Sequence, residues 1–337
     1  MFNHYVAIDW AMSNMAIARM TEKSNEVHII DVPSSIKELQ VYLKNLRGAI
    51  CLTFEETTTS QWLYTELNDY VDKIIICDGF RNKLLSDGPK TDKIDSGKLV
   101  KLLKADLLKE VYHTSNHFIE LRKIVSGYED TIKAGVRLKN QRSALFRAYN
   151  KNHKKELELD GDADSFVLQG FDENIDKYEH EKTRYLVEFK RLERKYPEIK
   201  RVSDIPGIGT KSAVKIVSRV VDAHRFRTKN HFLSYCGLIK LEKMSGGKSY
   251  GKKNPRYCRM MKSIFKMATL AVIGRDNQFG EYYKHLLEQK GYSERMARSA
   301  VSRKIAAVVY GVMKSKNKYE AHIHKKGIKD VDKTVDL

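Results

Sequence analysis

The chain has 337 residues, and its 62 lysines and arginines exceed its 43 aspartates and glutamates to give a formal net charge of +19. Its 42% content of hydrophobic residues is enough for roughly two folded cores, which excludes wholesale disorder. Solubility accounts for part of such a surplus of positive charge. The rest is typical of proteins that bind a polyanion, with nucleic acid as the first candidate.

Neither the apolar runs nor the cysteines indicate export. The longest apolar run, residues 305–313, falls far short of the roughly 20 residues of a membrane-spanning helix. The N-terminus lacks the basic and apolar segments of a secretion signal. No CxxC pair occurs, and the scattered cysteines are typical of reduced core residues. We therefore expect a cytoplasmic protein with no membrane partner. The cysteines are Cys51, Cys77, Cys236 and Cys258.

The first eighty residues alternate between strand and helix patterns. Three short strands are predicted within residues 6–32, and their connections are short enough to require antiparallel pairing. Apolar residues at helical spacing predict a helix over residues 36–46, with Ser34 or Ser35 as its N-cap. Further strands at residues 49–54 and 73–77 flank a helix at 61–67. This order is that of the ribonuclease H-like nucleases, so we predict an α/β domain over residues 1–115.

Residues 116–200 lose the strand pattern and become highly charged. Apolar residues at helical spacing predict two long helices that break near residues 159–164 and pair antiparallel as a coiled-coil arm. Basic residues gather near its tip, where a nucleic-acid contact and a solvated helix surface fit equally well. The candidate contacts are Arg142, Arg147, Lys151 and Lys154.

A mostly helical region is predicted over residues 201–318, ahead of a basic polar tail at 319–337. It opens with Pro206-Gly207-Ile208-Gly209, which resembles the turn of helix-hairpin-helix elements. In such turns glycines let backbone N–H groups approach a phosphate, which makes Gly207, Gly209 and Lys211 candidate nucleic-acid contacts. A plain tight turn is the alternative.

Acidic residues follow two strands that the predicted order makes neighbours. Asp9 ends the first strand, and either Glu55 or Glu56 ends the strand at 49–54, with Glu55 preferred because it is nearer the strand. Asp92 and Asp95 are three residues apart, which places both on one helix face. Such carboxylates repel one another unless a divalent cation lies between them. The alternative for this aspartate pair is favourable charge at the start of a helix capped by Thr91.

The segment 244–253 contains glycines, serines and lysines, among them Ser245 and Lys248. Its composition favours a flexible basic linker. The alternative is a serine presented to a phosphate among cations, because a hydroxyl nucleophile needs exposure and stabilisation of the developing charge.

Four motifs together resemble the DEDD transposases of the one-ten family of insertion sequences and their relatives, the pilin-gene invertases. The motifs are Val6-Ala7-Ile8-Asp9-Trp10, Phe54-Glu55-Glu56-Thr57, Lys90-Thr91-Asp92-Lys93-Ile94-Asp95 and Ile205-Pro206-Gly207-Ile208-Gly209, and Tyr235-Cys236-Gly237-Leu238 and Ser245-Gly246 follow them.

The resemblance implies a RuvC-like domain, a coiled-coil arm and a C-terminal transposase domain. It implies that Asp9, Glu55, Asp92 and Asp95 form a catalytic tetrad that binds Mg²⁺ or Mn²⁺, and that Ser245 is the nucleophile joined to DNA. It further implies a dimer or tetramer that acts on element ends and target DNA chosen by a structured bridge RNA. Two alternatives stay open: a metal-dependent nuclease such as a Holliday-junction resolvase, in which water attacks, and a non-catalytic nucleic-acid-binding protein.

Overall fold

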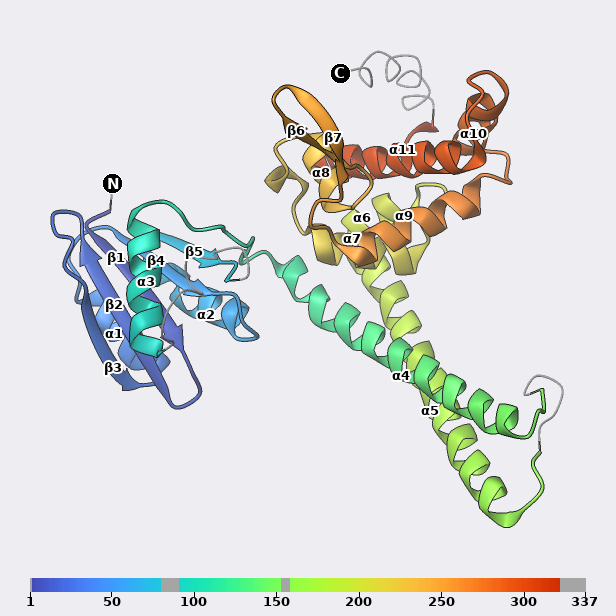
Figure 1. The fold of residues 1–337 in the computed structure, drawn as a ribbon, viewed down its shortest axis with the longest axis horizontal. Coiled ribbons are helices and arrows are strands. Elements are labelled where there is room, and N and C mark those ends of the chain that lie inside the picture. The colour runs from blue at the N-terminus through green and yellow to red at the C-terminus, as the bar shows by residue number, and fades with distance from the viewer. Residues whose placement is uncertain (1, 80–90, 153–157, 322–337) are drawn as a thin grey trace. The chain divides into compact units, whose positions relative to one another are not determined.

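The computed structural model describes residues 2–79, 91–152 and 158–321 and divides the chain into two compact units. These are the N-terminal unit, Met1–Asn116, and the C-terminal unit, His117–Leu337 (Figure 1). The predicted subdivision of the second unit into an arm, a transposase domain and a tail stays a prediction. Within the described ranges, no helix combines the length and the apolarity needed to cross a bilayer.

The N-terminal unit is built on a five-stranded mixed sheet in the order β3-β2-β1-β4-β5. The first three strands pair antiparallel, whereas β4 runs parallel to β1 and β5 parallel to β4. The predicted order of three antiparallel strands, helix, strand, helix and strand is confirmed. The strands are β1 (His4–Trp10), β2 (Asn14–Thr21), β3 (His28–Pro33), β4 (Ile50–Glu55) and β5 (Lys73–Cys77).

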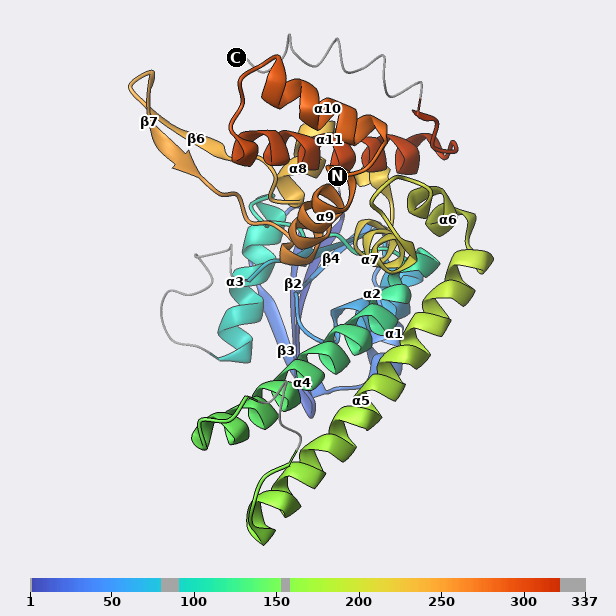
Figure 2. The same ribbon diagram turned by 90° about the vertical axis from the view of Figure 1, so that its right-hand side faces the viewer.

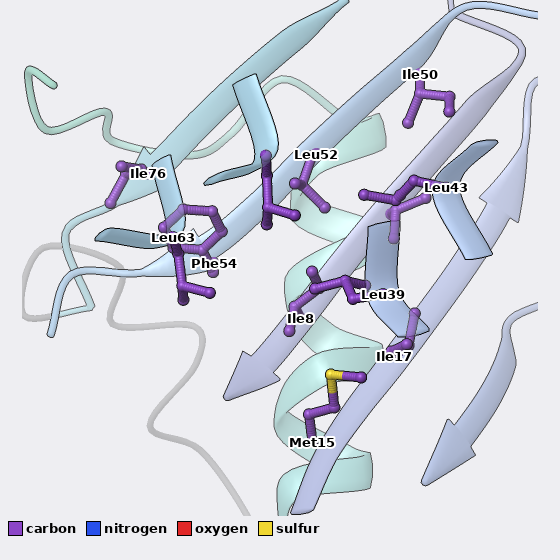
Figure 3. Close-up of a cluster of buried hydrophobic side chains, with 12 residues drawn as sticks. Ile8, Met15, Ile17, Leu39, Leu43, Ile50, Leu52, Phe54, Leu63 and Ile76 are labelled. Atoms are coloured by element: carbon purple, nitrogen blue, oxygen red, sulfur yellow. The ribbon is translucent and has the colours of Figure 1, made fainter. Parts of the chain in front are cut away.

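Helices cover both faces of this sheet. On one face α1 (Ile36–Lys44) and α2 (Ser60–Leu67) bury leucines against alternate residues of β1, β2 and β4 (Figure 3). The Ser35 side chain caps α1 by accepting a hydrogen bond from the Glu38 N–H. A 3₁₀ turn, η1 (Asn68–Tyr70), leads from α2 towards β5.

The opposite face of the sheet packs on α3 (Asp92–Lys104). Side chains point alternately to the two faces of a strand, so Ala7 and Cys51 meet α3 through Leu99 and Leu103 respectively. Gly97 brings α3 close to β3, since a Cβ there would lie 3.2 Å from Ile29 Cδ1. The prediction of reduced core cysteines is confirmed, because all four are free and only Cys258 is partly exposed.

Over its described residues, the C-terminal unit is helical apart from one hairpin. The long helices at its start are confirmed, although the first ends earlier than the predicted break near residue 159, and α6 and α10 were not predicted. Its helices are η3 (His117–Ile119), α4 (Leu121–Ala148), α5 (Asp162–Lys195), α6 (Pro197–Ser203), α7 (Thr210–Val220), η4 (Ala223–Arg225), α8 (Lys229–Tyr235), α9 (Arg259–Val272), α10 (Gln278–Glu288) and α11 (Glu294–Ser315).

Helices α4 and α5 lie side by side and run antiparallel (Figures 1 and 2). Glycines on α4 face tyrosines on α5: a Cβ at Gly135 would overlap the Tyr178 ring, and one at Gly127 would meet the Tyr185 hydroxyl. These two glycine–tyrosine contacts fix how far α4 is shifted along α5. The coiled-coil character of the pair stays a prediction.

We expect Gly135→Ala to destabilise the C-terminal unit by about 1–2 kcal/mol. The gain in helix propensity, up to about 1 kcal/mol, is smaller than the cost of displacing the Tyr178 ring. Gly170→Ala on α5 is the matched control, because nothing lies within 4 Å of its added Cβ, and it should stabilise by about 0.5–1 kcal/mol. Denaturant unfolding measures both, and equal stabilisation by the two variants would contradict the packing argument.

Candidate functional site

Two of the predicted acids end neighbouring strands. In the parallel pairing of β1 with β4, Ile8 lies opposite Phe54, so Asp9 and Glu55 follow at the same edge of the sheet. Ile8 and Phe54 both point into the core beneath α1 and α2. Because side chains alternate along a strand, Asp9 and Glu55 belong to the other face, on which α3 packs.

The first turn of α3 brings the other two acids to this edge. Asp92 and Asp95 both lie in that turn, and the Thr91 hydroxyl caps the helix by accepting from the Ile94 N–H at 3.3 Å. Burial, followed by the negative charges of Asp92, Glu55 and Asp95, raises the pKa of Asp9 from 3.8 to about 6. The negative charges of Asp92, Glu55 and Asp95 therefore act on Asp9, and the metal-binding role of the four acids stays a prediction. We call Asp9, Glu55, Asp92 and Asp95 the acid cluster.

The neighbouring Glu56 has a different environment. Its Oε2 lies 2.6 Å from Nε2 of the buried His113, whose Nδ1 is 2.9 Å from the Gln61 amide oxygen. Glu56 is absent from the charges that raise the pKa of Asp9, whereas Glu55 is among them. Between the two candidates left open by the sequence, the fold therefore places Glu55 beside Asp9. Gly79 leaves room there, since a Cβ on it would lie 2.9 Å from Glu55 Oε2.

The acid cluster has the chemistry of a site for a hard divalent cation. Carboxylate oxygens are the ligands that Mg²⁺ prefers. Asp95 Oδ1 is buried and receives no hydrogen bond from the described residues, and such an atom favours a cation partner. As placed, no three Asp, Glu, His or Cys side chains in the described part of the chain form a closed set of metal ligands. The carboxylate oxygens are donors of the type that Mg²⁺ prefers. To bind the ion, the four side chains would have to move closer to one another.

We expect Asp9→Asn to stabilise the metal-free protein at pH 7.5 by about 1–2 kcal/mol, after allowance for partial exposure. The folded state raises the pKa of Asp9, so the contribution of Asp9 to stability is greatest below about pH 4 and is lost as the pH rises through about 6. Asparagine keeps the shape without the charge, so its advantage should vanish near pH 4.

Thermal unfolding in chelator at pH 4 and at pH 7.5 measures this effect. The control is Asp69→Asn, which alters an exposed carboxylate on η1 and should change stability little at either pH. A destabilised Asp9→Asn protein at pH 7.5 would contradict the electrostatic argument.

Ser245 lies in a β-hairpin of the C-terminal unit, so the prediction of a flexible linker is wrong. Strands β6 (Leu241–Ser245) and β7 (Lys248–Lys253) pair antiparallel, with Ser245 opposite Lys248. Gly246 and Gly247 form the two-residue turn with φ of 55° and 76°, values that glycine adopts without strain. A Gly-Gly pair between two strand-length segments is a hairpin signal that could have been found in the sequence.

The hairpin exposes every residue of both strands and extends away from the helices (Figure 2). Lysines dominate it, and its one acid, Glu242, lies 3.4 Å from Lys252. A bulge after Lys243 leaves Tyr250 as the extra residue of β7, with the Lys243 ammonium 5.8 Å from its ring. The hairpin therefore presents Ser245 next to its turn, among positive charges that include Lys248.

The PGIG turn packs against α9 and begins α7. Gly207 has φ of 84°, and a Cβ on it would lie 2.7 Å from the Ala268 carbonyl oxygen, so packing alone accounts for this glycine. Gly209 is the N-cap residue of α7, and nothing lies within 4 Å of its Cβ position. Gly209 and Lys211 are exposed, which leaves this helix terminus accessible to an anion.

The arm-tip candidates have different surroundings. Arg142 is mostly buried, with its Nε donating to Asp172 on α5 at 2.5 Å, so it ties the two helices together. Arg147 and Lys151 line a hollow of about 290 Å³ beyond the end of α4, and Lys151 lies 3.3 Å from Asp160. Lys154, like Lys90 of the aspartate motif, lies outside the described residues.

Residues 199–284 match the family model described as Transposase IS116/IS110/IS902 family. The pilin gene-inverting proteins of Moraxella bovis and Moraxella lacunata are each 25% identical over 126 residues, 36% of this chain and 39% of theirs. The insertion element IS110 uncharacterized 43.6 kDa protein of Streptomyces coelicolor is 25% identical over 146 residues, 43% of this chain and 36% of that protein. The chain thus spans about two fifths of the length of these relatives.

The matched segment contains both the PGIG turn and the hairpin that carries Ser245. The family match, the relatives and the motifs along the rest of the chain agree with one another. The similarity to the IS116/IS110/IS902 family of transposases therefore rests on residues 199–284, and these relatives are similar to the chain over about two fifths of its length.

Proposed function

We propose that this protein is a DNA transposase or recombinase that exchanges strands with the acid cluster and Ser245. The observation that carries the proposal is the convergence of four acids at one sheet edge in a chain that also contains the family's transposase segment. The relatives named as pilin gene-inverting proteins support a reaction that cuts and rejoins DNA. The strand order of the N-terminal unit supports a ribonuclease H-like, RuvC-type fold for its catalytic half.

Within this proposal the acid cluster would hold Mg²⁺ or Mn²⁺. The metal, when bound, supplies Lewis-acid stabilisation of charge on a phosphate. The protein's own contribution is placement: β1 and β4 fix Asp9 and Glu55, and α3 fixes Asp92 and Asp95 on the same face. Holding four carboxylates together costs stability, as the raised pKa of Asp9 reflects.

Ser245 is the proposed nucleophile. Its Oγ would form a bond to phosphorus while the bond from phosphorus to the leaving strand end breaks, and its proton would pass to a base or to solvent. The covalent link conserves the energy of the phosphodiester, so a second strand end can attack it and restore Ser245. The exposed hairpin supports this role, since a nucleophile that attacks a large substrate must be accessible.

A structured guide RNA, a dimer or tetramer and a coiled-coil arm belong to the same proposal. The net charge of +19 supports RNA in addition to DNA as a partner. The candidate phosphate contacts with support from the fold are Gly209 and Lys211 at the start of α7, Lys248 on the hairpin, and Arg147 and Lys151 at the arm tip.

The test is a reaction with the full chain, Mg²⁺, RNA transcribed from the DNA flanking its gene, and a plasmid bearing element ends and insertion site. We expect joined recombinant DNA that depends on the RNA and on Mg²⁺. Free cleaved ends without joined product would instead favour the nuclease that uses water. DNA binding with neither cleavage nor joining would favour the non-catalytic alternative.

Arg147→Gln with Lys151→Gln should reduce the salt dependence of nucleic-acid binding. Each neutralised phosphate contributes about 0.9 to the slope of log affinity against log salt, so we expect that slope to fall by about 2. Lys133→Gln is the control, because Lys133 pairs with Asp130 on its own helix. Electrophoretic shift or anisotropy titrations at several salt concentrations measure the slope. A slope equal to that of the wild type would show that these tip charges are only solvated.

A further inference from the structure

The two tryptophans of the chain lie in contact on the face of the sheet that α1 and α2 cover, at the end where β1 reaches Asp9 and Trp10. The ring centroids of Trp10 and Trp62 are 5.4 Å apart and their planes meet at 73°, an edge-to-face contact. Trp10 directly follows Asp9 on β1, and Trp62 lies in the first turn of α2, close behind Glu55 along the chain. The indole pair therefore lies at the same end of the sheet as the acid cluster, on the opposite face, which α2 covers.

The hydrophobic core accounts for Trp10 but not for Trp62. Trp10 is partly buried and packs on the core beneath α1 and α2. Trp62 is 42% exposed and is not among the side chains packed on that core. Contact with Trp10 restrains the Trp62 ring, so a ligand that stacks on it would cost little additional side-chain entropy. We call Trp10 and Trp62 the aromatic platform, in which Trp10 supports the exposed ring of Trp62.

The position of the platform indicates its occupant. If the acid cluster binds a DNA phosphate, as the proposed function requires, the flanking nucleotides pass over this sheet edge. Bases within a duplex are stacked on one another, whereas an unpaired base offers a free π-face to an indole. We propose that Trp62, supported by Trp10, stacks on an unpaired base next to the phosphate held at the acid cluster, so that the N-terminal unit binds opened or single-stranded DNA.

This inference rests on the proposed function in taking DNA as the substrate, and binding alone tests it. The probes are oligo(dT) and an abasic oligomer of equal length, neither of which carries an element end. Wild type should bind oligo(dT) more tightly than the abasic oligomer. Trp62→Leu, which keeps apolar bulk without a ring, should weaken oligo(dT) binding by about five- to a hundredfold and leave the abasic affinity unchanged.

Trp62→Phe should recover part of the loss, because it restores an aromatic face. Val41→Ala is the matched control, since it removes apolar surface that is 57% exposed on α1 of the same unit and should bind as wild type. Tryptophan emission reports on this pair alone, because the chain has no other tryptophan. Oligo(dT) should quench the emission of wild type and should quench the Trp62→Phe protein much less.

Equal affinities of wild type and Trp62→Leu for oligo(dT), with unquenched emission, would overturn the platform and leave recombination unaffected. A protein that shows the quench and the selective loss but joins no DNA would retain the platform and lose the proposed reaction. Equal weakening of both oligomers by Trp62→Leu would overturn stacking in favour of a structural role for the side chain.

Discussion

Asp9→Asn and Asp95→Asn should each reduce strand exchange by at least about a thousandfold, because a metal that stabilises phosphate charge contributes several kcal/mol to the barrier. Asparagine keeps the shape of aspartate but removes the charge that would bind the cation. Asp95 is informative, since its Oδ1 is buried with no hydrogen bond from the described residues. The basic surfaces lie elsewhere in the chain, so affinity for nucleic acid should stay near that of the wild type.

The readouts are recombinant product and thermal stability with and without Mg²⁺. Mg²⁺ should raise the melting temperature of the wild type and have a much smaller effect on either variant, because a ligand stabilises only a fold that binds it. Glu56→Gln is the matched control, since Glu56 contacts His113 and does not act on Asp9. Recombination at the wild-type level by both Asp variants would disprove the assignment of the acid cluster.

Ser245→Ala should abolish both joined product and covalent protein–DNA adduct, since no other atom could then bond to phosphorus in the proposed reaction. The experiment traps a reaction on nicked or mismatched DNA, denatures it and detects protein attached to DNA. The hairpin should stay folded in this variant, because Ser245 is exposed and the turn is formed by Gly246 and Gly247.

Ser249→Ala is the matched control on the facing strand, where Ser249 pairs with Met244. Loss of the adduct only in Ser245→Ala supports Ser245 as nucleophile, whereas loss only in Ser249→Ala would transfer the role. An active wild-type protein that releases free ends without any adduct would identify water as the attacking group and support the nuclease alternative.

The order of the N-terminal elements was predictable because each has a strong local signal. Strands β1 to β5 have short apolar or alternating patterns, and Ser35 is a cap that starts α1. The hairpin has the glycine, serine and lysine content that is typical of linkers, and its one local signal is the Gly-Gly turn. Helices α6 and α10 were not predicted: α6 has only 7 residues and follows α5 almost directly, and α10 follows α9 closely.

The sequence by itself determined the family motifs, the positive charge and the candidate acids, because these depend on residue type and spacing. Only the tertiary structure shows that the charge of Glu55 acts on Asp9 while Glu56 contacts His113, because these contacts depend on which face of the sheet a strand end occupies and on a residue far away along the chain. The same holds for Gly207, whose packing on α9 has no local signal. It holds also for the contact of Trp10 with Trp62, which the pairing of β1 with β4 and the packing of α2 bring about. Local patterns specify elements, whereas long-range packing specifies which side chains meet.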